Sequence, residues 1–311
     1  MLLISAAAVW RTAGDAAPDP GVIAGPYASL LAASTDLGPS RAADAQLTVT
    51  LSRAAPPATL IDWADSHGLA VRWRPGADWA IVTGPAERLS AAFGVPVHDY
   101  RGRRGQTFYA STRQPLAPAA LRGDVTGVGR ILSYLPHRSA RPLPPRDVPR
   151  PGLTPRHLLT TYNATPLADA GYTGKGATIV ILGFDGYDQS DLDMFATVSG
   201  LPRFTPTVIG APLDPPHGET VMDLEVAHAI APDARLVVVN AKPTLQGGGT
   251  FEKIGLMFDE AATRFPGSVW SLSIGWGCDA MVTRADLAPV RAARTNAHRR
   301  GITVFDASGD I

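Results

Sequence analysis

The chain has 311 residues, a hydrophobic content of 45% and equal numbers of basic and acidic side chains, so its formal net charge is zero. This length exceeds the usual size of one domain and the apolar content is ample for a globular core, so two domains are expected. The neutral balance argues against a nucleic-acid partner, because proteins that bind nucleic acid gather an excess of positive charge.

The chain begins with a short apolar run at residues 1–10. The run has about the length of a signal-peptide core and falls far short of the ~20 residues that a membrane span needs. It lacks the basic residues that precede most export signals, so a shortened signal or anchor and a frayed apolar terminus both stay open. We expect a secreted or cell-envelope-associated protein in which residues 1–25 form a lead.

Short strands and helices are predicted to alternate through the first half. Period-2 alternation predicts a strand at 46–52, and a helical pattern follows at 58–68. The later elements are strands at 70–74 and 78–83, a helix at 86–93, and strands at 97–100 and 106–110. This order is that of a ferredoxin-like α+β unit, expected over residues 26–135.

Residues 136–155 carry seven prolines and no apolar periodicity. Such a composition predicts an extended, exposed linker that is accessible to proteolysis.

Apolar strands alternate with longer helices from residue 178 onward. Strands are predicted at 178–182, 207–209, 236–240, 269–274 and 303–305, and helices at 190–198, 219–230, 251–265 and 284–299. Strands that are apolar throughout and separated by helices indicate a mainly parallel sheet covered on both faces. Residues 156–311 are therefore expected to form an α/β domain with its site at the carboxyl ends of the strands.

Two carboxylates, Glu219 and Asp223, stand four residues apart at the start of the helix predicted at 219–230. At that spacing they share one helix face, where a like-charged pair costs stability. Most such pairs lie on a solvated face, but the rest of this helix is largely apolar, which favours a core helix. Proton transfer is one reason to keep such a pair, so both residues are candidate catalytic groups.

Two more candidates follow predicted strands. Trp276 stands between Gly275 and Gly277 in the segment SLSIGWG, which would let its indole lie over a cleft, although a packing role is an equal alternative. Asp310 follows the last strand in the segment ASGD, where a lone aspartate is usually a helix N-cap.

The glycine-rich segments do not predict a nucleotide site. The glycines at 171–176 precede a strand, and those at 247–249 lack the lysine and serine or threonine of a phosphate loop. An ordinary α/β cofactor enzyme is therefore disfavoured. No cysteine and histidine cluster has zinc spacing, so we expect neither a metal nor a cofactor in this chain.

Glu219 and Asp223 in GETVMDLEVAHAIAPDA, Trp276 in SLSIGWG and Asp310 in ASGD occur in the order of the sedolisin (serine-carboxyl peptidase, kumamolisin-like) family, which this chain resembles. The first half is similar to the family's activation propeptide, especially in AFGV at 92–95 and FYA at 108–110. Residues 153–163 and 171–176 resemble the family's mature N-terminus. The resemblance covers nearly the whole chain after residue 30.

The resemblance implies a subtilisin-like α/β domain and acid-active endopeptidase chemistry on a polypeptide substrate. Glu219 would be the general base that takes a proton from a serine, Asp223 would orient and tune it, and Asp310 would line the oxyanion hole. Trp276, with Gly275 and Gly277, would shield the acid pair. A carboxylate base works in acid, where a histidine would already be protonated.

The resemblance also has departures. The family's nucleophile lies in a Ser-Gly-Thr-Ser motif downstream of the aspartate, and no serine of this chain has that context. The family's calcium site would lie beyond Ile311. We therefore expect this chain to be an inactive, truncated zymogen. Family members often add another acid near the position of Leu182, and Asp185 is a candidate substitute.

A non-enzymatic function is the alternative. The first domain reads as a complete fold, so it could bind a complete peptidase in trans, as an inhibitor or folding aid.

Overall fold

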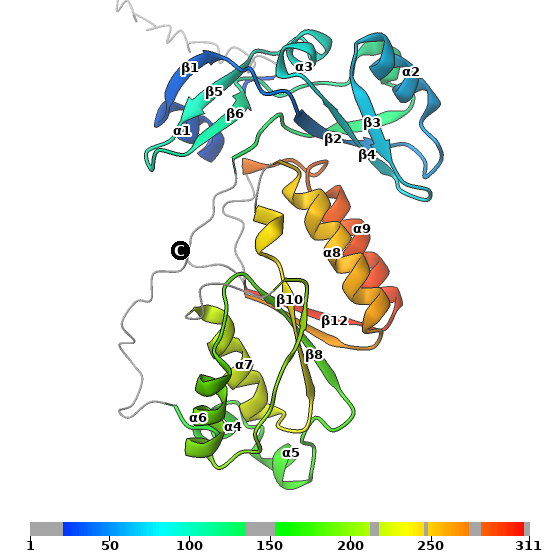
Figure 1. The fold of residues 1–311 in the computed structure, drawn as a ribbon. Helices are drawn as coiled ribbons and strands as arrows, with labels where there is room; N and C mark the ends of the chain where they lie inside the picture. Colours follow the sequence, from blue (N-terminus) through cyan, green and yellow to red (C-terminus); the bar gives the residue numbers. More distant parts are fainter. Residues whose placement is uncertain (1–20, 135–152, 212–217, 246–247, 274–280, 308–311) are drawn as a thin grey trace, which may run out of the picture.

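The structure is a computed structural model that describes residues 21–134, 153–211, 218–245, 248–273 and 281–307. The apolar run at 1–10, most of the predicted linker, and Gly275, Trp276, Gly277 and Asp310 lie outside these residues. Two structural units are stacked end to end, with an α+β unit at the top of Figure 1 and a parallel α/β unit below it. No helix in the described ranges is long and apolar enough to cross a membrane.

The first unit is built on a four-stranded antiparallel sheet in the order β3-β4-β2-β7. Its elements are β2 (Ala45–Leu51), α2 (Ala58–Ser66), β3 (Ala70–Trp73), β4 (Trp79–Gly84), α3 (Ala86–Phe93), η1 (Ala119–Leu121) and β7 (Val125–Val128). Alternate residues of β2, including Leu47 and Val49, pack with Leu60 of α2 and Leu89 of α3. The buried residues of this core all lie between residues 45 and 131.

A second sheet of the first unit corrects one sequence prediction. It joins β1 (Thr35–Pro39), β5 (Val97–Arg101) and β6 (Thr107–Ser111), next to α1 (Pro26–Ala32). Placing the strands at 97–100 and 106–110 in the main sheet was wrong, because β5 and β6 pair with each other and with β1. The position beside β2 belongs to β7, whose four residues include a glycine and give no clear strand pattern.

The second unit contains the parallel sheet that the sequence predicted. Its strands are β8 (Thr178–Gly183), β9 (Thr207–Ile209), β10 (Arg235–Asn240), β11 (Val269–Leu272) and β12 (Thr303–Asp306). They run in the order β12-β11-β8-β10-β9, and every neighbouring pair is parallel. The prediction of a mainly parallel sheet is confirmed.

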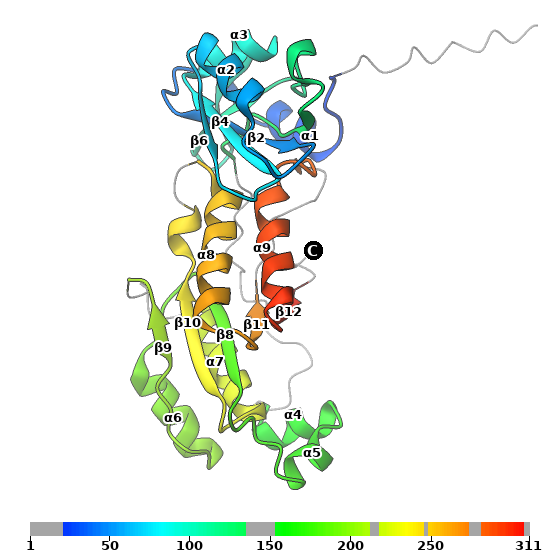
Figure 2. The same cartoon turned by 90° about the vertical axis from the view of Figure 1, so that its right-hand side faces the viewer.

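Helices cover both faces of this sheet (Figures 1 and 2). The elements are α4 (Pro155–Thr161), α5 (Thr165–Asp169), α6 (Gln189–Ser199), α7 (Glu219–Ile230), η2 (Lys242–Leu245), α8 (Thr250–Arg264) and α9 (Ala288–Arg299). Val180 and Leu182 of β8 pack in the core formed with α8 and α9, whereas Ile181 packs with Leu192 of α6 and Leu224 of α7. The strand alternation therefore assigns α6 and α7 to one face, and α8 and α9 to the other.

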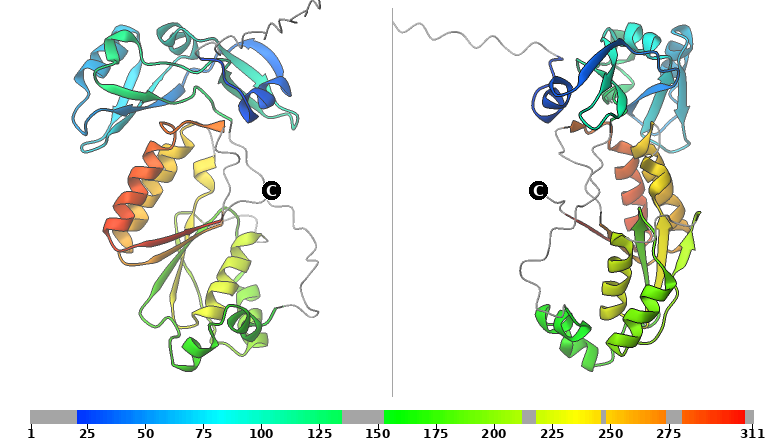
Figure 3. Two further views of the ribbon diagram at one scale, coloured as in Figure 1. Left: turned by 180° about the vertical axis from the view of Figure 1, so that it is seen from behind. Right: turned by 60° about the vertical axis from the view of Figure 1, so that its left-hand side comes forward.

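The two units meet where α8 and α9 reach the first unit, as both views of Figure 3 show. Arg72 of β3 donates to the carboxylate of Glu252 in α8, with an Nη2 to Oε2 distance of 2.6 Å. Met281, only 5% exposed, packs in the cluster that contains Tyr27 and Phe108 of the first unit. Segment 281–286 therefore lies inside the boundary between the units.

Asp286 is the buried polar residue of this boundary. Its carboxylate accepts the backbone N–H of Arg130 at 3.0 Å and both the N–H and the hydroxyl of Thr283. The Arg130 guanidinium carbon lies 4.4 Å from the centre of the Tyr27 ring. Burial raises the pKa of Asp286, and the hydrogen bonds from Thr283 and Arg130 oppose that rise.

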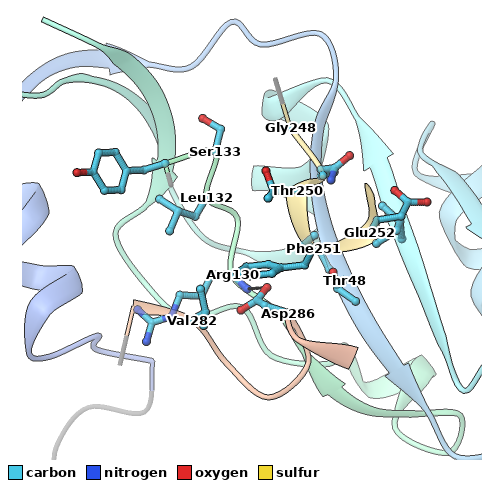
Figure 4. A pocket seen from close by; sticks show the side chains of 15 residues that line it. Thr48, Arg130, Leu132, Ser133, Gly248, Thr250, Phe251, Glu252, Val282 and Asp286 are labelled. Carbon is cyan, nitrogen blue, oxygen red and sulfur yellow. Dashed lines mark hydrogen bonds between the residues drawn. The ribbon is translucent and has the colours of Figure 1, made fainter. Parts of the chain in front are cut away.

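A cavity of about 60 Å³ opens beside Asp286 (Figure 4). Residues of both units line it, including Thr48 and Arg130 from the first and Thr250, Glu252 and Asp286 from the second. Neither Glu219 nor Asp223 is among its lining residues. The cavity is a feature of the unit boundary and not of the predicted acid site.

Candidate functional site

Two polar residues follow the carboxyl ends of neighbouring strands, beside the start of helix α7. Asp185 follows β8, and Ser273 follows β11, the strand that pairs with β8. Helix α7 begins at Glu219. The backbone N–H groups of Glu219 and Thr220 both donate to the Asp185 carboxylate, so the start of the helix lies against Asp185. The site is thus assembled at the edge of the sheet where parallel α/β domains place their ligands.

Asp223 is the half-buried member of the acid pair. Ser273 Oγ donates a hydrogen bond to Asp223 Oδ1 at 3.1 Å. Burial raises the pKa of Asp223 to about 6, the negative charge of Asp185 adds to that rise, and the bond from Ser273 opposes it. Asp223 therefore keeps a proton in mild acid, where an ordinary aspartate is ionised.

Glu219 lies one helical turn before Asp223, on the same face of α7, and its side chain is exposed. The two acids therefore occupy contrasting environments, since one is partly withdrawn from water and the other faces it. Contrasting environments of this kind separate the pKa values of two carboxyl groups, so that one group can donate a proton while the other accepts one.

Helix α7 is only partly the core helix that the sequence predicted. Thr220, Leu224 and His228 are buried, and His228 stacks on Phe204 with its Nε2 2.7 Å from the carbonyl oxygen of Pro202. The opposite positions are exposed, namely Met222, Val226 and Ile230. The helix is apolar on both sides, and among the described residues only one side is covered by the sheet.

The described residues thus bring Glu219 and Asp223 together and leave Trp276, Gly275, Gly277 and Asp310 untested. Ser273 was missed as a site residue, although its place at the end of the strand in SLSIGWG was a usable signal. No group of histidine, cysteine, aspartate or glutamate side chains in the described ranges is arranged to hold a metal ion.

Replacing Asp223 by asparagine is expected to stabilise the protein at pH 7 and to leave it unchanged near pH 4. The pKa of Asp223 is raised in the folded state, so wild-type stability is complete in acid and falls as the pH rises through about 6. Asparagine stays neutral and avoids that loss, which we put at about 1–2 kcal/mol after allowing for partial exposure.

Urea unfolding at pH 4 and pH 7 measures this difference, with Asp62→Asn as a control for loss of one exposed carboxylate. A variant that is less stable than wild type at pH 7 would show that ionised Asp223 is well solvated.

The first unit matches a known family. Residues 51–134 match the family described as "Pro-kumamolisin, activation domain". The described elements of this stretch run from the end of β2 to β7 and so include most of the main sheet. The chain is thus similar to an activation domain over residues 51–134, and a parallel α/β unit follows this stretch.

A curated relative extends the match into the second unit. The chain is 28% identical over 269 residues to Kumamolisin from Bacillus sp. (strain MN-32), which covers 80% of this chain. The chain spans 47% of the length of that relative. Both matches support the resemblance of this chain to the sedolisin family.

Among solved structures, a Pseudomonas sedolisin described as a serine-carboxyl proteinase, complexed with two molecules of pseudo-iodotyrostatin, is 23% identical with a TM-score of 0.41. The match covers 51% of this chain and 45% of the sedolisin chain.

Proposed function

We propose that the chain belongs to the precursor of an acid-active endopeptidase. Its catalytic groups would be a serine, a glutamate and an aspartate, and its substrates would be polypeptides. The observation that carries the proposal is the pairing of exposed Glu219 with half-buried Asp223 at the carboxyl edge of the parallel sheet. The relationship to Kumamolisin supports the reaction class.

In this proposal Glu219 is the general base. Its exposed carboxylate can accept a proton from a serine hydroxyl, and a glutamate stays ionised at a pH where histidine would be charged. Asp223 keeps its own proton until the pH approaches about 6, so in acid it can donate a hydrogen bond toward Glu219 and hold it in place. Asp310 would stabilise the oxyanion, and Trp276, between Gly275 and Gly277, would shield the acids from water.

We further propose the division of the chain along these lines. Residues 26–135 form an activation propeptide, whose strand order β3-β4-β2-β7 supports the ferredoxin-like arrangement. Residues 136–155 form the linker that is cleaved on activation, and residues 156–311 contribute to the catalytic domain. We also propose export to the cell envelope or the medium, a proposal that the apolar run at 1–10 supports.

The test compares two proteins. We expect the 311-residue protein to leave a denatured polypeptide uncut between about pH 3 and 7, because none of its serines lies in a Ser-Gly-Thr-Ser segment. A longer product of the same reading frame that contains such a segment should cleave in acid. In that product Glu219→Gln should lower kcat by about 10³-fold or more, because the base is lost.

Glu225→Gln is the matched control, because it removes a carboxylate from the same helix at a position away from the Glu219 edge. Full activity of Glu219→Gln would refute the assignment of the base. Cleavage by the 311-residue protein would overturn the expected inactivity.

A second candidate function is binding in trans to a complete peptidase. The observation that favours it is the core under the main sheet of the first unit, whose buried residues all come from that unit. We expect the 311-residue protein to inhibit an active relative such as Kumamolisin in a saturable manner. Unchanged activity of the relative in the presence of a large excess of the protein would remove this candidate.

A further inference from the structure

The start of helix α7 has no cap of its own. Its N-cap residue is Gly218, which has no side chain to accept the N–H groups of the first turn. The first N–H groups of a helix need hydrogen-bond acceptors, and in most helices the side chain of the N-cap residue supplies one. In this protein the acceptor comes from a residue distant in sequence.

Asp185 supplies that acceptor. Its Oδ2 accepts the N–H of Glu219 and its Oδ1 accepts the N–H of Thr220, each at 2.9 Å, across 34 and 35 residues of chain. Both oxygens of one carboxylate are therefore used on consecutive amides. Asp185 ties the loop after β8 to the helical turn that carries Glu219.

Gly218 leaves the room that this contact requires. A Cβ atom at position 218 would lie 1.9 Å from Asp185 Oδ2 and 2.1 Å from its Cγ, closer than such atoms approach. Gly218 and Asp185 are thus fitted to each other. This close fit is an observation independent of the hydrogen bonds.

Asp185 also acts on Asp223 through its charge. The groups that face Asp223 are Asp185 from the loop after β8, Ser273 from the end of β11, and Glu219 one turn earlier on α7. The negative charge of Asp185 favours the protonated form of Asp223, whereas the hydroxyl of Ser273 favours the ionised form. The same residue that caps the helix therefore adds to the effect of burial on the second acid.

We propose that Asp185 is the positioning residue of the acid pair, because its carboxylate fixes the first turn of α7 beneath Glu219. The inference deepens the proposed function, because it names the group that orients the two acids. It also explains why the residue before Glu219 is a glycine.

The experiment separates the cap from the charge by means of two variants. Asparagine keeps one acceptor oxygen, so Asp185→Asn removes the charge and one of the two bonds, whereas Asp185→Ala removes the charge and both bonds. The pKa of Asp223 is followed by NMR of the aspartate carboxyl carbons, and hydrogen exchange is measured at the amides of Glu219 and Thr220. Neither readout depends on peptidase activity, so failure of the proposed function would leave the result interpretable.

We expect Asp185→Asn to lower the pKa of Asp223 from about 6 while one of the two amides stays protected. Asp185→Ala should lower the pKa of Asp223 as well and should speed exchange of the two amides by about 5- to 30-fold, which corresponds to loss of an N-cap. Gly218→Ala, which displaces the Asp185 carboxylate, should reproduce the alanine variant. Asp188→Asn is the matched control, because Asp188 lies in the same loop and caps nothing with its side chain.

An unchanged titration of Asp223 in Asp185→Asn would overturn the electrostatic role. Unchanged amide exchange in both Asp185→Ala and Gly218→Ala would overturn the positioning role. A fall in the pKa of Asp223 in Asp188→Asn as large as in Asp185→Asn would reduce the effect to general surface charge and would also refute the proposal.

Discussion

Replacing Trp270 by alanine is expected to lower the free energy of unfolding of the second unit by about 3–5 kcal/mol, the range found for large aromatic residues in packed cores. Trp270 is fully buried at the middle of β11, where it pairs with Val180 of β8 and Val304 of β12. Its ring centre lies 5.2 Å from that of Phe258 in α8. Removing the indole therefore leaves a cavity between the sheet and the helix layer of α8 and α9.

The loss of stability would be large because the substitution leaves a buried polar group without one of its partners, in addition to the cavity. The indole Nε1 donates to Ser268 Oγ at 3.0 Å, so the buried hydroxyl loses a partner as well. Since whole domains are stable by about 5–15 kcal/mol, the variant should unfold at a much lower urea concentration. Phe305→Ala, on the neighbouring strand but 63% exposed, is the control and should change little. Equal midpoints for the two variants would contradict the burial of Trp270.

The second large effect is expected from Gly129→Ala at the boundary between the units. A Cβ atom at position 129 would lie 2.3 Å from Asp286 Oδ1 and 2.9 Å from the carbonyl oxygen of Thr48. One contact is with the backbone of β2, so side-chain rotation alone cannot relieve the crowding. We expect Gly129→Ala to cost about 2–3 kcal/mol and to break the bond between Asp286 and the Arg130 amide.

Methionine oxidation reports whether the boundary opens. Met281 is 5% exposed inside it, whereas Met194 on α6 is 65% exposed. Peroxide should oxidise Met194 at the same rate in every protein, and Met281 much faster in Gly129→Ala than in wild type. Gly123→Ala is the control, since an added Cβ there would meet nothing within 4 Å. Protection of Met281 in Gly129→Ala would show that the boundary does not depend on this contact.

The sequence predicted the parts of the fold whose residues follow a strong period. The parallel sheet was predicted because β8 and β10 are apolar throughout, and α7 and α8 were placed almost to the residue. The prediction failed for β7 and for the separate sheet of β5 and β6. Strand pairing between remote segments depends on tertiary packing, and a short strand with a glycine carries little periodic signal.

The candidate site divides in the same way. Glu219 and Asp223 could be paired from their spacing, since a helix puts residues four apart on one face. Ser273 and Asp185 could not be joined to them with equal force, because they reach α7 only through the order of β11 and β8 in the sheet. The raised pKa of Asp223 depends on burial, which spacing alone does not give.

The boundary between the units also constrains the order in which the protein can fold during synthesis. Its polar contacts join residues far apart along the chain, since 180 residues separate Arg72 from Glu252 and 156 separate Arg130 from Asp286. The core under the main sheet of the first unit, by contrast, is complete once residue 131 has left the ribosome. The main sheet of the first unit can thus fold while α8 and α9 are still being synthesised. The two units can dock only near the end of translation.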